Sequence, residues 1–186
     1  MPIASLVRPG ARGGALAAAV AATFALPSPA HAFPGSPSAF AIKHVSSGTC
    51  VAAPAEAGDD GGGGGGIPWW QNRLVHQNCD GGTTQRWVYR ADDQTLRSVA
   101  RPGQCVTPVA PPHGLPHQLA LRPCESGAGA QKWRSSLRSA GNAGEHVQPA
   151  GDAGYAWQGT SLSGAVQYLG AWDRAEAQQW TFPTGS

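Results

Sequence analysis

Charged residues are scarce in this sequence, and neither sign is in marked excess. Of the 186 residues, 13% are charged, and the formal net charge at neutral pH is +2. Nucleic acids and anionic membranes are usually bound through a stripe of Lys and Arg, which this chain lacks. We therefore expect no nucleic-acid partner.

The familiar motifs of hydrolytic and zinc-dependent catalysis are also missing. The chain has no Gly-x-Ser-x-Gly elbow and no His-Glu-x-x-His signature. It has no Cys-x-x-Cys pair either, which disfavours a zinc site. Glutamates scattered among loops leave open only a carboxylate pair assembled in space. We expect a protein that is not an enzyme and that uses no cofactor and no metal.

Long apolar runs are limited to one segment near the N-terminus. Its 12 uncharged residues begin at Ala15, which is short of the roughly 20 that a membrane-spanning helix needs. Two arginines precede the run and the small residues around Ala32 follow it, as in a secretory signal. We predict a signal peptide over residues 1–32, cleaved near Ala32, then a short linker over 33–39. The product would be secreted, with no transmembrane span.

The remaining chain is long enough for one domain with a substantial core. Removing residues 1–32 takes away two arginines and no acidic residue, which leaves 154 residues with 11 Lys+Arg and 11 Asp+Glu. The formal net charge of the mature chain is therefore zero. We expect a single domain over residues 40–186.

A glutamine stands two residues before a tryptophan at three places in the chain. The pairs are Gln85/Trp87, Gln131/Trp133 and Gln178/Trp180. The tryptophans lie 46 and 47 residues apart, and such an even period predicts an internal threefold repeat. The predicted repeats cover about 40–90, 91–136 and 137–182. Each tryptophan lies in a short β-prone run bounded by Gly, Pro, Asn and Asp, which indicates an all-β fold.

Four cysteines fall within the first two repeats. An even number of cysteines in an exported chain indicates disulfides, and four cysteines allow three connectivities. Only one connectivity treats the two repeats alike, and it joins Cys50 to Cys79 and Cys105 to Cys124. Leu-Arg-Ser occurs nine residues before Cys105 and again nine residues before His146. This phrase aligns His146, together with Trp172, with the cysteines that the third repeat lacks.

The run Cys79-Asp80-Gly81-Gly82-Thr83-Thr84-Gln85-Arg86-Trp87 resembles the end of a repeat in ricin-type β-trefoil domains. These domains are also called R-type lectins or the Gln-x-Trp family, and the resemblance extends from about Phe40 to Phe182. It implies a β-trefoil with three four-stranded repeats around a pseudo-threefold axis. In that fold the tryptophan would fill the shared core, and the glutamine would satisfy buried backbone groups.

The residues that form the sugar pockets of this family have changed. A pocket usually takes an Asp two residues after the first cysteine, an aromatic residue two before the second, and an Asn before the Gln-x-Trp glutamine. The matching residues here are Ala52, Gln77 and Thr84, then Thr107, Arg122 and Ala130, then Gln148, Gly170 and Ala177. No position keeps the expected residue type, although Gln77 and Gln148 remain candidate carbohydrate-binding side chains. We expect degenerate pockets with weak or absent galactose binding.

Two other segments carry candidate carbohydrate-binding residues. The first is a long loop in which Asp59 and Asp60 precede six glycines and then Trp69 and Trp70. The two indoles could form a platform for a sugar or a protein, or could cap the barrel. The second is an aromatic cluster in the third repeat, with Tyr155, Trp157, Tyr168 and Trp172. This cluster could be a binding surface, or could supply the bulk that replaces a missing disulfide.

Together these features favour a secreted, non-catalytic protein that binds carbohydrates or glycoconjugates. Its partners would be glycans or glycoproteins on a cell surface. An alternative is a host-surface-binding delivery subunit of a secreted toxin, because degenerate repeats of this kind resemble the non-catalytic subunits of cytolethal distending toxins. Such a subunit would also bind the other proteins of a toxin complex. A third interpretation is a structural or inhibitory trefoil with no glycan partner.

Overall fold

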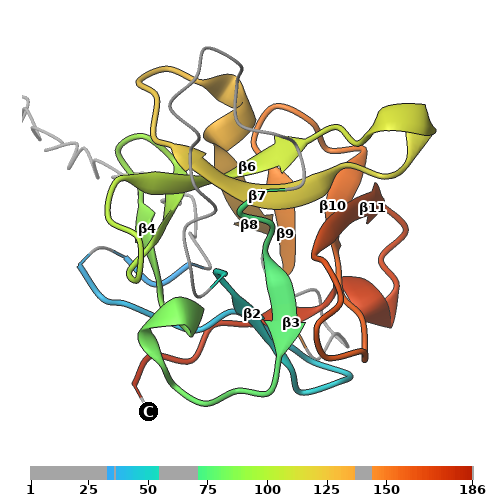
Figure 1. Ribbon diagram of the computed structural model, residues 1–186, viewed down its shortest axis with the longest axis horizontal. Coiled ribbons are helices and arrows are strands. Elements are labelled where there is room, and N and C mark those ends of the chain that lie inside the picture. Colours follow the sequence, from blue (N-terminus) through green and yellow to red (C-terminus); the bar gives the residue numbers. More distant parts are fainter. Residues whose placement is uncertain (1–32, 36, 55–70, 137–143, 186) are drawn as a thin grey trace, which may run out of the picture.

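The computed structural model describes residues 33–35, 37–54, 71–136 and 144–185, which form three similar repeats of four strands (Figure 1). The first repeat contains β1 (Lys43–His44), β2 (Cys50–Ala52), β3 (Val75–Gln77), a 3₁₀ turn (Thr83–Gln85) and β4 (Trp87–Arg90). The second contains β5 (Thr95–Ser98), β6 (Gln104–Val109), a 3₁₀ turn (Pro112–Gly114), β7 (Gln118–Pro123), a 3₁₀ turn (Gly129–Gln131) and β8 (Trp133–Ser136). The third contains β9 (His146–Pro149), β10 (Tyr155–Gln158), β11 (Tyr168–Ala171), a 3₁₀ turn (Glu176–Gln178) and β12 (Trp180–Thr181).

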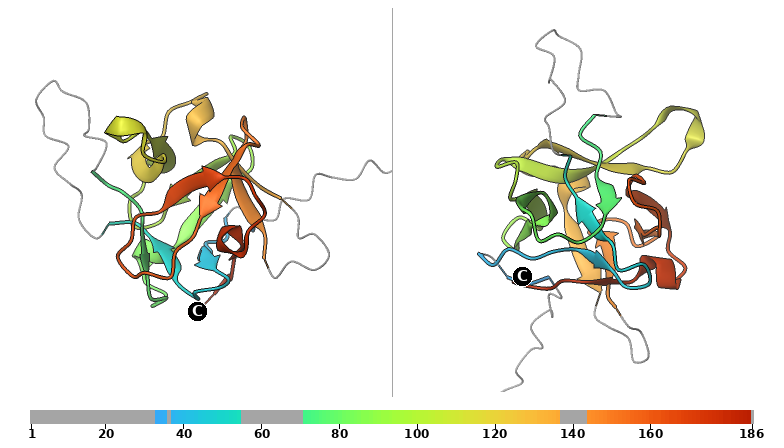
Figure 2. Two further views of the ribbon diagram at one scale, coloured as in Figure 1. Left: turned by 90° about the vertical axis from the view of Figure 1, so that its right-hand side faces the viewer. Right: turned by 60° about the horizontal axis from the view of Figure 1, so that its bottom comes forward.

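The strand pairing repeats three times and confirms the predicted β-trefoil. Neighbouring repeats are joined by the antiparallel pairs β4–β5, β8–β9 and β12–β1. Within the repeats, the middle strands form the hairpins β2–β3, β6–β7 and β10–β11. The pairing of β12 with β1 brings the last strand beside the first and closes the barrel (Figures 1 and 2).

The three Gln-x-Trp tryptophans occupy the centre of the molecule and are fully buried. Each indole donates its Nε1–H to a backbone carbonyl in the second strand of its own repeat. The bonds run from Trp87 to Val51 (3.1 Å), from Trp133 to Val106 (2.9 Å) and from Trp180 to Trp157 (3.2 Å). The indole therefore supplies apolar volume while it leaves no buried N–H without a partner.

The three glutamines hold the turn that follows the third strand of each repeat. Gln85 Nε2 donates to the carbonyl of Asn78 at 2.7 Å, and its Oε1 accepts from the backbone N–H of Asp80 at 3.0 Å. The same two bonds link Gln131 to Pro123 and Glu125, and Gln178 to Ala171 and Asp173. Both ends of each amide are used, as the resemblance implies for a structural residue.

These hydrogen bonds also show which residues are equivalent in the three repeats, and one predicted alignment is wrong. Because Trp157 accepts from its tryptophan as Val51 and Val106 do, Ala156 and not His146 matches the first cysteine. His146 begins β9 and matches Thr95. The alignment was based on the Leu-Arg-Ser tripeptide, which occurs before β6 in the second repeat but before β9 in the third. It therefore paired the second strand of one repeat with the first strand of the next. Trp172 does match Cys124, since the next residue donates to the framework glutamine in both repeats.

The predicted disulfides are present, and the third repeat replaces its missing bridge with aromatic packing. Cys50 is bonded to Cys79 and Cys105 to Cys124, with S–S distances of 2.01 and 2.06 Å. In the third repeat, the Trp172 ring lies on the ring of His146, with centroids 4.3 Å apart and planes at 79°. This edge-to-face contact joins the first strand of the repeat to the loop after the third.

The segment predicted as a linker over 33–39 contributes to the core. Phe33 is only 2% exposed, and its ring centroid lies 4.7 Å from that of Tyr89 and 4.8 Å from that of Phe182. Phe40 completes the cluster at 6.0 Å. Phe33 therefore belongs to the core of the described residues, although it lies seven residues before Phe40 in the sequence.

A buried polar chain joins the first repeat to the third through His76. Its Nε2 donates to Gln167 Oε1 at 2.6 Å, and its Nδ1 accepts from the hydroxyl of Thr49 at 3.0 Å. The amide nitrogen of Gln167 donates to the carbonyls of Gln158 and Tyr168, which leaves its oxygen facing the imidazole. Burial lowers the pKa of His76 to about 4, so the ring is neutral at neutral pH.

Replacing the buried ring near the N-terminus tests whether Phe33 belongs to the core. We expect Phe33→Ala to lower the free energy of unfolding by about 3 kcal/mol, because the change leaves a cavity among aromatic rings. Chemical denaturation of the oxidised protein measures the loss. Leu162→Ala is the matched control, since Leu162 is 68% exposed and its truncation should cost less than about 0.5 kcal/mol. Equal effects of the two changes would contradict the core assignment.

The buried histidine makes stability depend on pH. We expect the free energy of unfolding to fall as the pH is lowered from 6.5 to 4. A histidine in the unfolded chain is protonated near pH 6.5, whereas His76 in the folded protein is protonated only near pH 4. Below pH 4, the free energy of unfolding should be lower by about 3 kcal/mol than above pH 6.5. Burial also lowers the pKa values of His44 and His146, which adds to the same decline.

Urea denaturation at several pH values measures this dependence. The slope between pH 6.5 and 4 should be shallower in His76→Gln than in the unmodified protein. His113→Gln removes an exposed histidine and should leave the slope unchanged. An unaltered slope in His76→Gln would show that another group causes the acid sensitivity.

Candidate carbohydrate-binding surfaces

In all three repeats, the pocket position that usually holds an Asp has no carboxylate available to hydrogen-bond a sugar. With the corrected alignment, the position two residues after the first cysteine is held by Ala52, Thr107 and Gln158. Thr107 Oγ1 and Gln158 Oε1 each accept a hydrogen bond from the framework glutamine of their repeat, both at 3.1 Å. These polar groups are therefore directed toward the framework, and Ala52 has none to offer.

The other pocket positions are similarly altered. Arg122 stands where the second repeat would carry an aromatic ring, and its Nη1 donates to the carbonyls of Gln71 and Leu121 at 2.9 and 2.8 Å. In the third repeat the same position is Gly170. None of the three positions therefore presents a ring on which a pyranose could stack.

The two glutamines predicted to contact sugar lie in different surroundings. Gln77 is half-buried on β3, opposite Cys50. Gln148 is 5% exposed on β9 and donates to the carbonyl of Ala153 at 3.3 Å. The prediction that Gln148 lines a pocket is wrong, because the corrected register gives that position to Gln158. Sequence counting missed Gln158, since the tryptophan follows its hydrogen-bond acceptor by 36, 27 and 23 residues in successive repeats.

The aromatic cluster predicted in the third repeat divides between core and surface. Trp157 is fully buried, with its ring edge-to-face to Trp133 at 5.4 Å and to Trp180 at 6.0 Å. It cannot contact a sugar, and the packing interpretation holds for this residue. Tyr155, two positions earlier on the same strand, is 48% exposed. The other candidates, Asp60, Trp69 and Trp70, lie outside the described residues.

Tyr155 lines a groove between the second and third repeats. The groove has a volume of about 690 Å³ and is lined by Pro108, Leu115 and His117 on one side and by Asp152, Tyr155 and Ala171 on the other, among others. The tip of the β6–β7 hairpin projects beyond the barrel beside β11, as two views show (Figures 1 and 2). His113 and Gly114 form this tip with φ values of 66° and 69°, so the chain reverses sharply there.

The groups in this groove suit a saccharide. The half-exposed phenol ring can cover the apolar face of a pyranose, and a carboxylate can accept hydrogen bonds from its hydroxyl groups. Asp152 uses Oδ1 to accept the backbone N–H of Gly154 at 2.8 Å, which orients the carboxylate in the turn before β10. Sequence reasoning found Tyr155 but missed Asp152, Leu115 and His117, because only the folded hairpin brings them near it.

Within the described ranges, no three His, Cys, Asp or Glu side chains come together as a metal site would require. The same part of the chain contains no helix of the length and apolarity needed to span a membrane.

Comparison with known proteins agrees with this architecture. The family model of the ricin-type beta-trefoil lectin domain matches residues 38–180. None of the curated proteins matches the chain significantly.

Several solved structures share the fold at low sequence identity. The C-half of the earthworm R-type lectin in complex with GalNAc is 14% identical, with a TM-score of 0.56 over 80% of this chain and 100% of that one. The Macrolepiota procera ricin B-like lectin in complex with lactose is 18% identical, with a TM-score of 0.57 over 79% and 95%. A mosquitocidal holotoxin is 14% identical, with a TM-score of 0.61 over 80% of this chain but only 17% of that chain.

At such identities the solved structures show a shared fold alone, whereas the family model matches most of the sequence. The framework of three buried tryptophans and three bonded glutamines lies within the matched residues. This chain therefore belongs to the family of ricin-type β-trefoil lectin domains.

Proposed function

We propose that this protein is a secreted, non-catalytic module that binds glycans or glycoproteins through a site displaced from the usual pockets. One observation carries the proposal: Tyr155 is half-exposed in a groove that also contains the Asp152 carboxylate. Family membership supports a carbohydrate ligand, as do the GalNAc and lactose that two lectins of the same fold bind.

Export and lack of catalysis are parts of the same proposal. The signal-like pattern of residues 1–32 supports secretion, and two disulfides suit an oxidising compartment. The sequence carries none of the common hydrolase motifs, which supports binding without turnover.

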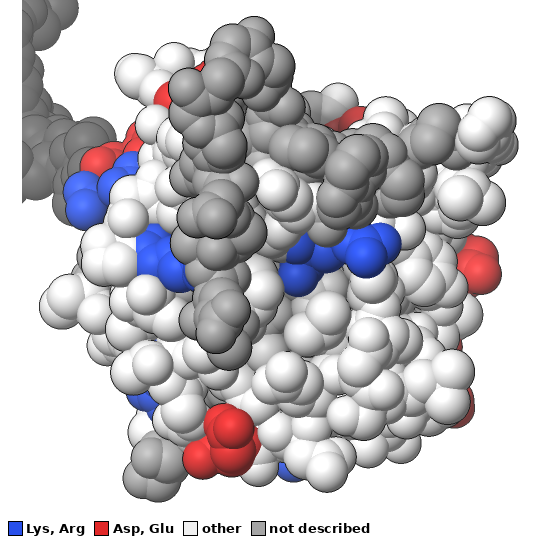
Figure 3. Space-filling view, viewed as in Figure 1, with Lys and Arg blue, Asp and Glu red and all other residues white. Residues whose placement is uncertain are grey.

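A protein-binding role is the second candidate, in which the chain would be the delivery subunit of a secreted toxin. Leu115 and Leu162 are 55% and 68% exposed, so both side chains are available to a protein partner. Figure 3 shows a basic band across the middle of one face and an acidic cluster near its lower edge, with mostly uncharged surface between them. The resemblance in fold to part of a mosquitocidal holotoxin supports this candidate.

A glycan array with matched variants tests the displaced site. Tyr155→Ala should weaken binding at least about tenfold, because the stacking surface is lost. Tyr155→Phe keeps the ring and should retain most of the affinity. Asp152→Asn keeps the bond to Gly154 but removes the charge, and should weaken binding about tenfold. All three variants must match the thermal stability of the unmodified protein.

Two results would contradict the proposal that glycans bind in the Tyr155 groove. A glycan that still binds Tyr155→Ala but is lost in the double variant Trp69→Ala/Trp70→Ala would place the site on the long loop. A blank array from a well-folded protein would favour the toxin-subunit candidate instead.

A further inference from the structure

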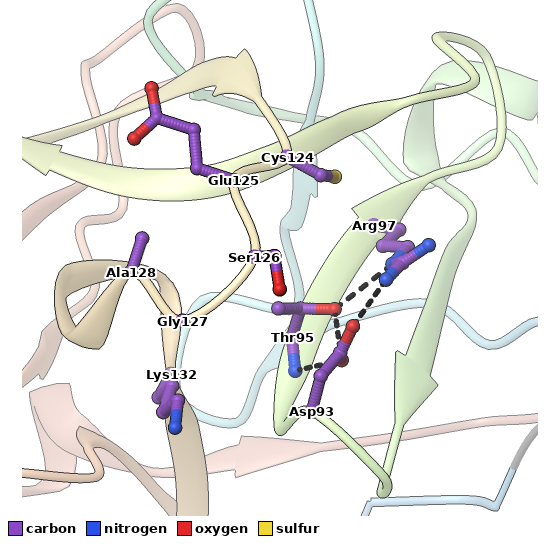
Figure 4. A pocket seen from close by; sticks show the side chains of 9 residues that line it. All are labelled: Asp93, Thr95, Arg97, Cys124, Glu125, Ser126, Gly127, Ala128 and Lys132. Carbon is purple, nitrogen blue, oxygen red and sulfur yellow. Dashed lines mark hydrogen bonds and ion pairs between the residues drawn. The ribbon is translucent and has the colours of Figure 1, made fainter.

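The crevice between the first strand of a repeat and the loop after its third strand is open in the second repeat but filled in the third. In the third repeat, Trp172 fills it by packing against His146. The equivalent residues in the second repeat are Cys124 and Thr95, which are much smaller. A cavity of about 270 Å³ lies there, lined by Thr95, Cys124 and neighbouring polar residues (Figure 4).

One wall of this cavity is an interlocked polar network. Asp93 Oδ1 accepts from the backbone N–H of Thr95 at 3.1 Å and from its hydroxyl at 2.6 Å. Arg97 Nε donates to the Thr95 hydroxyl at 2.9 Å, and its Nη2 forms an ion pair with Asp93 Oδ2. Each side chain is held by the other two, so the wall is ordered before any ligand arrives.

The opposite wall is the loop after β7. Figure 4 shows the Ser126 hydroxyl pointing toward Thr95, whereas the Glu125 carboxylate points away from the network. Gly127 has a φ of 79°, and the bond from Ala128 N–H to the Glu125 carbonyl closes a tight turn. The turn holds Ser126 at the rim, where it is exposed.

Four charged side chains line the cavity: Asp93 and Arg97 form an ion pair, whereas Glu125 and Lys132 form none with any described residue. Burial raises the pKa of Asp93, but hydrogen bonds from Thr95 and the charge of Arg97 outweigh this and lower it below its usual value. Asp93 is therefore ionised at neutral pH and neutralises Arg97. Lys132 also lines the cavity, and its ammonium makes no ion pair with any of the described residues.

We propose that this cavity binds an acidic sugar unit, with its anionic group at Lys132 and its hydroxyl groups at the Asp93–Thr95 network and Ser126. The ligand class rests on the proposed glycan-binding function, but the site is separate from the Tyr155 groove. A volume of about 270 Å³ suits one monosaccharide unit. Paired Asp93 and Arg97 can both bond to hydroxyl groups, and the unpaired ammonium favours a carboxylate or a sulfate ester.

Calorimetric titration of the oxidised protein at low ionic strength tests the site. The probes are glucuronic acid and galactose 6-sulfate, which separate a carboxylate from a sulfate, together with neutral galactose. We expect at least one acidic sugar to bind about tenfold or more tightly than galactose, with an affinity that falls as salt is added. Lys132→Gln should remove that advantage. Ser126→Phe should block the cavity in the way that Trp172 fills its counterpart.

Lys43→Gln is the matched control, because Lys43 is an exposed lysine on β1 and its replacement changes the charge equally. Equal binding of acidic and neutral sugars would overturn the proposal. Equal losses in Lys132→Gln and Lys43→Gln would also overturn it, since only the total charge would then matter.

The two proposals can fail separately. If Tyr155→Ala abolishes all sugar binding while Lys132→Gln changes none, the cavity proposal is overturned and the glycan function stands. If no saccharide binds at all, both are overturned.

Discussion

The hydrogen bond from each Gln-x-Trp indole to a carbonyl of the second strand is the interaction on which the rest of the fold depends. It fixes the hairpin of each repeat to the barrel at distances between 2.9 and 3.2 Å. Loss of the bond would leave a buried N–H and a buried carbonyl without partners, which is costly in an apolar interior. The three equivalent indole bonds, together with the three framework glutamines, recur in every repeat, whereas the loops around them differ.

The repeats differ most in the crevice beside the first strand and at the usual pocket positions. The second repeat keeps small residues beside its disulfide and leaves a cavity, whereas the third fills the same place with Trp172 and His146. The framework glutamines Gln131 and Gln178 donate hydrogen bonds to Thr107 and Gln158, so two of the usual pocket positions support the fold. The two binding sites that we propose lie elsewhere: one between the second and third repeats, and one in a crevice of the second repeat.

Much of the fold could be predicted from particular residues. The even spacing of three Gln-x-Trp pairs indicates the repeat, and the position of four cysteines within it predicts both disulfides. The core role of Trp157 and the burial of Phe33 were less accessible, because neither belongs to the repeated motif. The repeat alignment failed at His146 because the connections between strands differ in length from repeat to repeat. The Leu-Arg-Ser tripeptide then aligned β6 of the second repeat with β9 of the third.

Residue types at a repeated spacing established the threefold repeat and favoured the disulfide pairing. The trefoil class and the loss of the usual sugar-binding residues followed from the resemblance of these motifs to ricin-type domains. Which polar residues face a common space depends instead on the packing of segments that are distant in the sequence. The Tyr155 groove combines residues from two repeats, and the Lys132 cavity combines strand β5 and the turn before it with the loop after β7. Such juxtapositions depend on how the hairpins pack on the barrel, and no periodicity along the chain records that packing.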